Sequence, residues 1–276
     1  MLGEKPVYML HHCRDNINRR KEIMFCHKCG AQIAEGTAFC LQCGAEIVDN
    51  VEAQVKLGDR FYYGEGAEQD FAEAVKWYRK AVLCGHAGAQ VKLGDCYFEG
   101  EGVEQDFSEA VRWYKAPAEK GFAPAQVGLG NCYHWGCGVE EDLSEAVKWY
   151  RKAAEQGDAV GQVNLGYCYQ WGSGVEVDEP VAVAWYEKAA EQDDPDALYN
   201  LGLCYQHGFG VVRDEKAAVM WYRKAAEQGD TRAQRSLGEC YSYGWGVEQN
   251  HTEAVLWYKR AAEQGDEEAR EILGLL

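Results

Sequence analysis

The sequence predicts an all-α protein that is built as a solenoid of helix-turn-helix repeats. Aligning the chain with itself gives a fixed period of 36 residues, which is typical of stacked repeat architectures. Within each period, two apolar stripes recur at helical spacing. A glycine pair and then an acidic or amide residue separate the stripes, so each unit contains two helices joined by a turn. The units open at Ala53, Ala89, Ala125, Gly161, Ala197 and Ala233, and a truncated seventh unit opens at Ala269.

The first helix is predicted to span the first eleven residues of each unit. In the second unit its buried stripe is formed by Ala89, Leu93, Cys96 and Tyr97, which fall within an arc of about 100°. A glycine in mid-helix costs roughly 1 kcal/mol relative to Ala, so its recurrence predicts a close contact between helices where no side chain fits. The recurring glycines are Gly58, Gly94, Gly130, Gly166, Gly202 and Gly238.

The second helix is predicted to begin at a capping residue whose side chain accepts hydrogen bonds from free backbone amides. In four units a Glu follows three residues later and completes a capping box. Pro117 interrupts the apolar stripe of the second unit, so we expect that helix to kink or to end early. The capping residues are Asp70, Asp106, Asp142, Asp178, Asp214 and Asn250.

The repeated motif LGxCYxxGxGVexDxxEAVkWYrKAAEqG resembles the Sel1-like repeat family, a relative of tetratricopeptide repeats. The resemblance covers residues 53–276. It implies a right-handed superhelix of antiparallel helix pairs that acts as a non-enzymatic adaptor or regulator of protein complexes. The periodicity leads independently to the same helix pairs, because one pair cannot bury its own apolar face and stacked copies form a continuous core.

The N-terminal part contains four cysteines in two Cys-x-x-Cys-Gly knuckles, at Cys26, Cys29, Cys40 and Cys43. Two such knuckles complete a tetrahedral shell of four thiolates, which favours one structural zinc ion without an open coordination position. A pair of redox dithiols and an iron-sulfur cluster are the alternatives. The segment resembles the small zinc ribbon found at the start of many bacterial regulatory and scaffold proteins. We expect a disordered extension over residues 1–23, the ribbon over 24–47 and a linker over 48–52.

The net charge of −17 lies entirely in the repeats, because residues 51–276 hold 22 Lys and Arg against 39 Asp and Glu. Such a surface repels nucleic acid and favours a basic protein or peptide as the partner. The sequence has no apolar run of the roughly 20 residues that a membrane span needs, and no secretory signal. We therefore expect a cytoplasmic, bacterial protein. The sequence does not indicate its oligomeric state.

The first helices carry a face opposite the buried stripe where the otherwise similar repeats diverge. Divergence there predicts a concave binding surface for one asymmetric ligand, with exposed aromatic residues as its main contacts. The alternative interpretation is that the sequences of the repeats diverged on this face because no function constrains it. The candidate partner-binding residues are Asp59, Tyr62, Tyr63, Asp95, Phe98, Glu99, His134, Trp135, Gln170, Trp171, Gln206, His207, Glu239 and Tyr243.

Two further columns of repeated residues are interpreted as packing. Repeated cysteines on the buried stripe are typical of small core residues, and repeated tryptophans beside the second apolar stripe are typical of inter-repeat contacts. The cysteines are Cys96, Cys132, Cys168, Cys204 and Cys240, and the tryptophans are Trp77, Trp113, Trp149, Trp185, Trp221 and Trp257.

The sequence contains no recognisable catalytic set. The alternative function is β-lactam binding or hydrolysis, as in a secreted, cysteine-rich branch of the Sel1-like family, but the short cysteine spacing of that branch is missing here. A regulator that acts through its ribbon is a third hypothesis.

Overall fold

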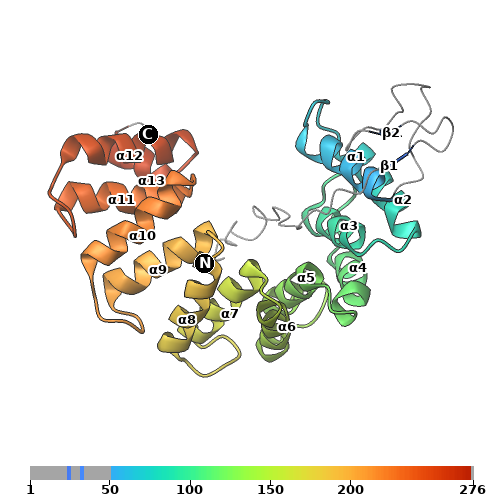
Figure 1. Ribbon diagram of the computed structural model, residues 1–276, viewed down its shortest axis with the longest axis horizontal. Helices are drawn as coiled ribbons and strands as arrows, with labels where there is room; N and C mark the ends of the chain where they lie inside the picture. The colour runs from blue at the N-terminus through green and yellow to red at the C-terminus, as the bar shows by residue number, and fades with distance from the viewer. Residues whose placement is uncertain (1–23, 26–31, 34–50, 275–276) are drawn as a thin grey trace. The chain divides into compact units, whose positions relative to one another are not determined.

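A computed structural model describes residues 24–25, 32–33 and 51–274. The first four of these residues form two short strands, β1 (Met24–Phe25) and β2 (Gln32–Ile33), which pair antiparallel with Met24 opposite Ile33. The rest of the described chain is helical (Figure 1). The predicted all-α repeat architecture is therefore confirmed.

Each repeat contributes two helices that are joined by a glycine-containing turn. The first helices are α1 (Val51–Tyr63), α3 (Ala87–Glu99), α5 (Ala123–Trp135), α7 (Ala159–Trp171), α9 (Pro195–His207) and α11 (Thr231–Tyr243). The second helices are α2 (Phe71–Leu83), α4 (Phe107–Glu119), α6 (Leu143–Glu155), α8 (Glu179–Ala190), α10 (Glu215–Glu227) and α12 (His251–Glu263), and α13 (Glu267–Ile272) follows them.

The second helices begin directly after the predicted caps, whose side chains accept backbone hydrogen bonds in every repeat. The first helices begin two residues earlier than the apolar pattern predicts. In the later repeats an Asp caps them, as Asp158 does for α7 by accepting from the Gly161 amide at 2.8 Å. The capping residue, rather than the first buried residue, sets the start of the helix.

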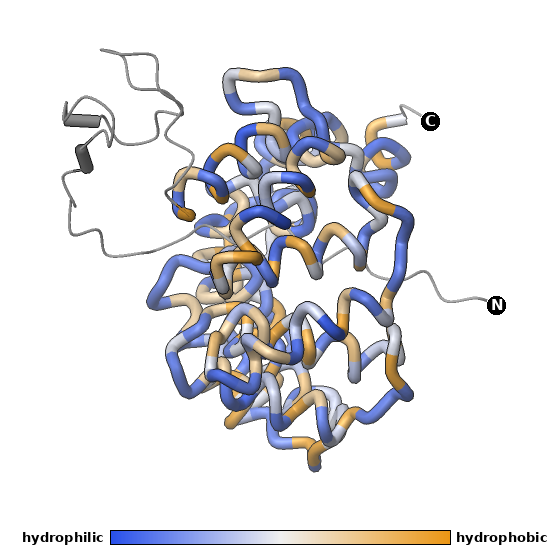
Figure 2. Tube along the Cα trace, turned by 90° about the vertical axis from the view of Figure 1, so that its right-hand side faces the viewer, coloured by the Kyte–Doolittle hydropathy of each residue, from blue (hydrophilic) through white to orange (hydrophobic). Residues whose placement is uncertain are grey.

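The chain divides into two compact units, residues 1–105 with α1 to α3 and residues 106–276 with α4 to α13. Within each unit, every helix packs against the helices before and after it in the chain. Hydrophilic and hydrophobic residues alternate along these helices, as Figure 2 shows, because each helix buries one face against its neighbours. This stacking gives helices α8 to α12 one shared hydrophobic core, as in a solenoid.

Fully buried tyrosines of the second helices lie against the glycines of the first helices. A Cβ added at Gly130 would lie 2.6 Å from the ring of Tyr150, and one added at Gly238 would lie 2.8 Å from the ring of Tyr258. The close contact predicted from the repeated glycine is confirmed, and its partner is the tyrosine ring. The five cysteines of the repeat are buried, as predicted, and Cys132 and Cys168 lie near the Tyr150 ring.

Buried glutamines link neighbouring helices in three of the repeats. The Gln162 side-chain amide donates to the Ala154 carbonyl at 3.3 Å, and the Gln192 side-chain amide donates to the Gln162 carbonyl oxygen at 3.0 Å. Gln126 and Gln234 make the same two interactions in their own repeats. The bonds to the backbone give a second donor to carbonyls in the last turn of the second helices, which also accept from the amide of the glycine after the helix.

The predicted early end of the helix that contains Pro117 is wrong. Helix α4 has the same 13-residue length as its neighbours and continues to Glu119. Pro117 lies in the last turn, where its ring is fully buried and its carbonyl accepts a hydrogen bond from the Phe122 amide at 3.0 Å. The helix continues because a backbone hydrogen bond lost this close to its end costs little free energy. Burial of the proline ring offsets part of that cost.

Candidate interaction surface

Several of the predicted binding residues serve the fold. Asp59 accepts a hydrogen bond from the Tyr78 hydroxyl at 2.8 Å and forms an ion pair with Lys92 at 3.1 Å. Gln170 accepts from the Tyr186 hydroxyl at 2.8 Å, and Gln206 accepts in the same way from a tyrosine of the next helix. The Tyr62 hydroxyl donates to Glu101. The acceptor oxygens of these residues therefore already serve hydroxyl groups of the fold.

His134 is buried, with 8% of its surface exposed. Burial lowers the pKa of this imidazole despite the opposing effect of Glu141, so the ring is neutral at physiological pH. The exposed members of the predicted set lie at the ends of the first helices, and Asp95, Phe98 and Glu239 are half-buried. The exposed members are Tyr63, Glu99, Trp135, Trp171, His207 and Tyr243.

In the second unit, aromatic rings from three consecutive repeats lie in contact and form a row, called here the aromatic row. Its members are Trp135, His134, Tyr167, Trp171, Phe209 and His207. Successive ring centroids are 4.5, 6.2, 6.4, 6.1 and 5.3 Å apart. Trp171 is 57% exposed, Tyr167 43% and Trp135 38%. Tyr243 and Trp245 stack at 4.8 Å in the last complete repeat.

Three of these aromatic residues are missing from the sequence-based prediction. Tyr167 stands where the other repeats carry Asp, Asn, Leu or Glu, so its difference from them was a usable signal. Phe209 and Trp245 lie in the turns after α9 and α11, which the pattern identifies only by their glycines. Contacts between repeats bring these turn residues beside the helix ends.

The repeated tryptophans of the second helices have a different environment. They are half-buried or buried, and a Lys or Arg three residues later covers the ring in five of the six repeats, at 3.6–4.7 Å from the centroid. Among the described residues, no Lys or Arg covers Trp171, Tyr243 or Trp245 in this way. The repeated tryptophans therefore form part of the packing, whereas Trp171, Tyr243 and Trp245 keep exposed rings.

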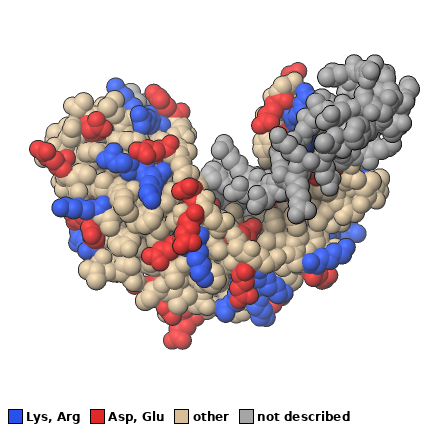
Figure 3. All heavy atoms as spheres, viewed as in Figure 1, with Lys and Arg blue, Asp and Glu red and all other residues tan. Residues whose placement is uncertain are grey.

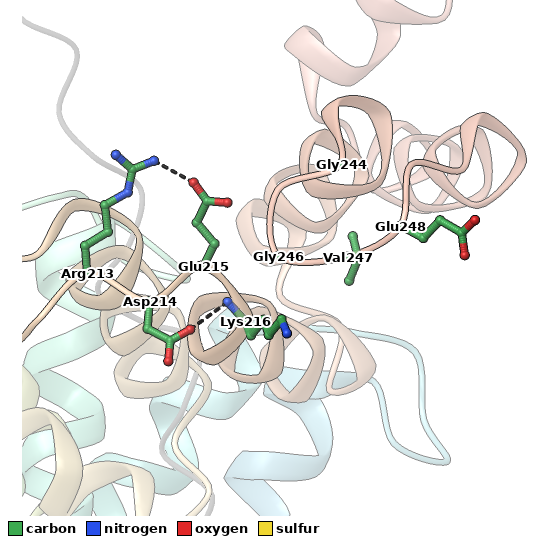
Figure 4. A pocket seen from close by; sticks show the side chains of 8 residues that line it. All are labelled: Arg213, Asp214, Glu215, Lys216, Gly244, Gly246, Val247 and Glu248. Atoms are coloured by element: carbon green, nitrogen blue, oxygen red, sulfur yellow. Dashed lines mark hydrogen bonds and ion pairs between the residues drawn. The ribbon is translucent and has the colours of Figure 1, made fainter.

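A hollow of about 710 Å³ lies between the start of α10 and the turn after α11 (Figure 4). Arg213 pairs with Glu215 at 2.6 Å, and the Lys216 backbone amide donates to the Asp214 carboxylate at 2.9 Å. Arg213 and Glu215 therefore neutralise each other, and the Asp214 carboxylate caps the start of α10. The opposite wall of the hollow is formed by Gly244, Gly246, Val247 and Glu248.

The described residues contain no group of three or more His, Cys, Asp or Glu side chains arranged to hold a metal ion. The predicted zinc ligands Cys26, Cys29, Cys40 and Cys43 lie outside the described residues. Over residues 51–274, no helix combines the length and the apolar character that crossing a membrane requires.

Burial raises the pKa of the Cys96, Cys168, Cys204 and Cys240 thiols to about 12. The nucleophilic thiolate is therefore scarce at neutral pH. We expect a maleimide at pH 8 to leave these four thiols unlabelled in the native protein and to label them after unfolding in urea. Peptide mapping by mass spectrometry reads the sites, with the urea-unfolded protein as the control. Labelling of Cys168 in the native protein as fast as in the unfolded protein would contradict the buried environment.

Comparison with known proteins identifies both parts of the chain. The Sel1 repeat matches residues 51–86, 87–122, 123–158, 159–194, 195–230 and 231–266, and a zinc-ribbon domain matches residues 25–47. A search of curated proteins found no match.

Solved structures agree with this assignment. A protective antigen of uropathogenic Escherichia coli, which displays an SLR fold, is 42% identical with a TM-score of 0.66, and the match covers 82% of this chain and 48% of that one. The chain thus spans about half the length of that antigen. A Sel1 repeat protein from Oxalobacter formigenes is 35% identical with a TM-score of 0.71, over 79% of this chain and 89% of that one.

An immunity protein from Pseudomonas aeruginosa, 20% identical over 75% of this chain and 81% of that one, shares the fold with a TM-score of 0.55. The six matched repeats follow one another without a gap over residues 51–266, which is most of the chain. The chain is a member of the Sel1 repeat family that carries a zinc-ribbon domain ahead of its repeats.

Proposed function

We propose that this protein is a non-enzymatic adaptor that binds a protein or an extended peptide along the aromatic row of its second unit. The observation that carries the proposal is the continuous series of six rings, four of them more than a third exposed, across three repeats. Exposed Trp and Tyr residues dominate the binding energy of protein interfaces. Proteins with stacked Sel1 repeats generally act as interaction scaffolds, which supports the same proposal.

The charge of the second unit favours a basic partner. Residues 106–276 hold 29 Asp and Glu against 16 Lys and Arg. In the described part of the face in Figure 3, Lys and Arg lie among Asp and Glu and form no continuous basic patch. A negative surface attracts basic segments over a distance of about 8 Å at physiological salt, and cations stack well on exposed indole rings such as that of Trp171.

The proposal includes one zinc ion held by the four ribbon cysteines and a location in the bacterial cytoplasm. Four thiolates suit zinc and fill its coordination shell, so the ion would stabilise the ribbon without taking part in a reaction. Twelve cysteines also fit a reducing compartment, where structural disulfides are rare.

Partner capture tests the proposal. The tagged full-length protein and its Trp135→Ala/Trp171→Ala variant are incubated with cell lysate, and bound proteins are identified by mass spectrometry. We expect the double variant to lose affinity for its partner by at least about 30-fold, the effect of removing one hot-spot residue. The far-ultraviolet circular dichroism spectrum should not change, because both indoles are substantially exposed.

Met220→Ala is the matched control, because it removes exposed apolar surface (46% exposed) from the second helix α10. Capture should persist in this variant and should weaken as salt is added if the partner is basic. Retention of the same partner by the tryptophan double variant would contradict binding on the aromatic row. Capture that does not respond to salt would contradict only the basic character of the partner and not binding on the aromatic row.

A further inference from the structure

The end of α2 differs from the corresponding end of every other second helix. Leu83 is 87% exposed, and the exposed Cys84 follows it. At the position of Leu83 the other repeats have Glu119, Glu155, Glu191, Glu227 and Glu263. At the position of Cys84 they have Lys120, Gln156, Gln192, Gln228 and Gln264. The first repeat thus replaces two polar side chains with apolar ones at a site that faces water.

This apolar end lies beside the start of α1. The His86 imidazole is 3.3 Å from the Glu52 carboxylate, and Val51 and Val82 pack against the same small core. The first residue of α1 is therefore a near neighbour of the last turn of α2.

The zinc-ribbon domain is joined to this same place by a short link. Its match ends at residue 47 and α1 begins at Val51, so residues 48–50 connect them. Consecutive Cα atoms are 3.8 Å apart, which limits the distance from residue 47 to Val51 to roughly 15 Å. The ribbon cannot move far from Leu83.

We propose that the zinc-ribbon domain docks on the apolar end of α2 formed by Val82, Leu83 and Cys84. A link of this length holds the ribbon at an effective concentration in the millimolar range, so a small apolar contact is enough to keep it in place. A stable interface with a separate protein needs roughly 20–30 residues per side. The three side chains at the end of α2 are too few for that, which favours a tethered domain of the same chain. The ribbon also carries large apolar residues of its own, among them Phe39 just before its second knuckle and Leu41 within it.

Hydrogen–deuterium exchange of the full-length, zinc-loaded protein tests the docking. Leu83→Glu installs the residue that the five other repeats carry, so the variant is expected to fold. We expect amides of residues 25–47 and 80–86 to exchange about tenfold faster or more in Leu83→Glu, as loss of a buried Leu predicts. Exchange in α7 and α8 should stay the same.

Zinc release to a chelator is the second readout. It should be faster by a similar factor from Leu83→Glu and unchanged from Leu83→Met, which keeps an apolar side chain. Equal exchange over residues 25–47 and equal zinc release in all three proteins would overturn the proposal. Protection of residues 80–86 that disappears on dilution of the wild-type protein would assign the surface to a second copy instead. Either result leaves the proposed binding on the aromatic row unaffected.

Discussion

Replacing Gly174 with Ala is expected to lower the free energy of unfolding of the second unit by about 3 kcal/mol. Gly174 has a φ of +75°, a left-handed conformation that costs an L-residue roughly 1–2 kcal/mol. A Cβ at this position would also overlap the carbonyl group of Leu143, the first residue of α6 in the preceding repeat. The substitution therefore acts on the stacking of one repeat on the next.

Gly157→Ala is the matched control in the same unit. Gly157 has a φ of +89°, but no atom lies within 4 Å of the Cβ that it would gain. Urea denaturation followed by circular dichroism should show a loss of about 1–2 kcal/mol for Gly157→Ala, the strain alone. Equal losses for the two variants would show that the turn glycine serves only the backbone conformation and not the contact between repeats.

Tyr150→Ala is expected to cost about 3–5 kcal/mol, the usual cost of truncating a large aromatic core residue to Ala. The ring is 1% exposed and fills the space left by Gly130, and its hydroxyl donates to the Asn131 side chain at 2.8 Å. Tyr150→Phe keeps the ring and loses that hydrogen bond, so it should cost only about 1 kcal/mol.

A double-mutant cycle separates the ring contact from the general cost of truncation. Gly130→Ala should destabilise the wild-type protein, because the new methyl group would lie 2.6 Å from the Tyr150 ring. In the Tyr150→Ala background the same change should stabilise by about 1 kcal/mol, the ordinary helix preference of Ala over Gly. The same sign in both backgrounds, measured by urea denaturation, would contradict the proposed fit of ring against glycine.

The repeat architecture could be read from the sequence because each of its determinants is local and occurs several times. The 36-residue period, the capping residues and the apolar stripe locate the helix pairs, and the repeated Gly and Cys mark where helices pack closely. Even the early start of the first helices had a sequence signal, an Asp such as Asp158 three residues before a buried position.

The candidate surface could be predicted only in part. Divergence among repeats led to the exposed Trp135 and Trp171, but it equally selected Gln170 and Asp59, which accept hydrogen bonds from tyrosine hydroxyls. A polar side chain at a variable position reads the same in the sequence whether its partner is a ligand or a neighbouring helix. Only the contact between helices distinguishes the two.

The sequence by itself determined that this protein is a stack of helix pairs, because periodic apolar residues and caps act through the few residues around them. The tertiary structure decided which side chains reach solvent. It placed Tyr167 and Phe209 in one row with two tryptophans, and it left Leu83 uncovered at the end of α2. Exposure of a side chain and contacts between rings depend on residues a whole repeat away in the chain. The relative positions of residues so far apart are fixed by packing rather than by local sequence.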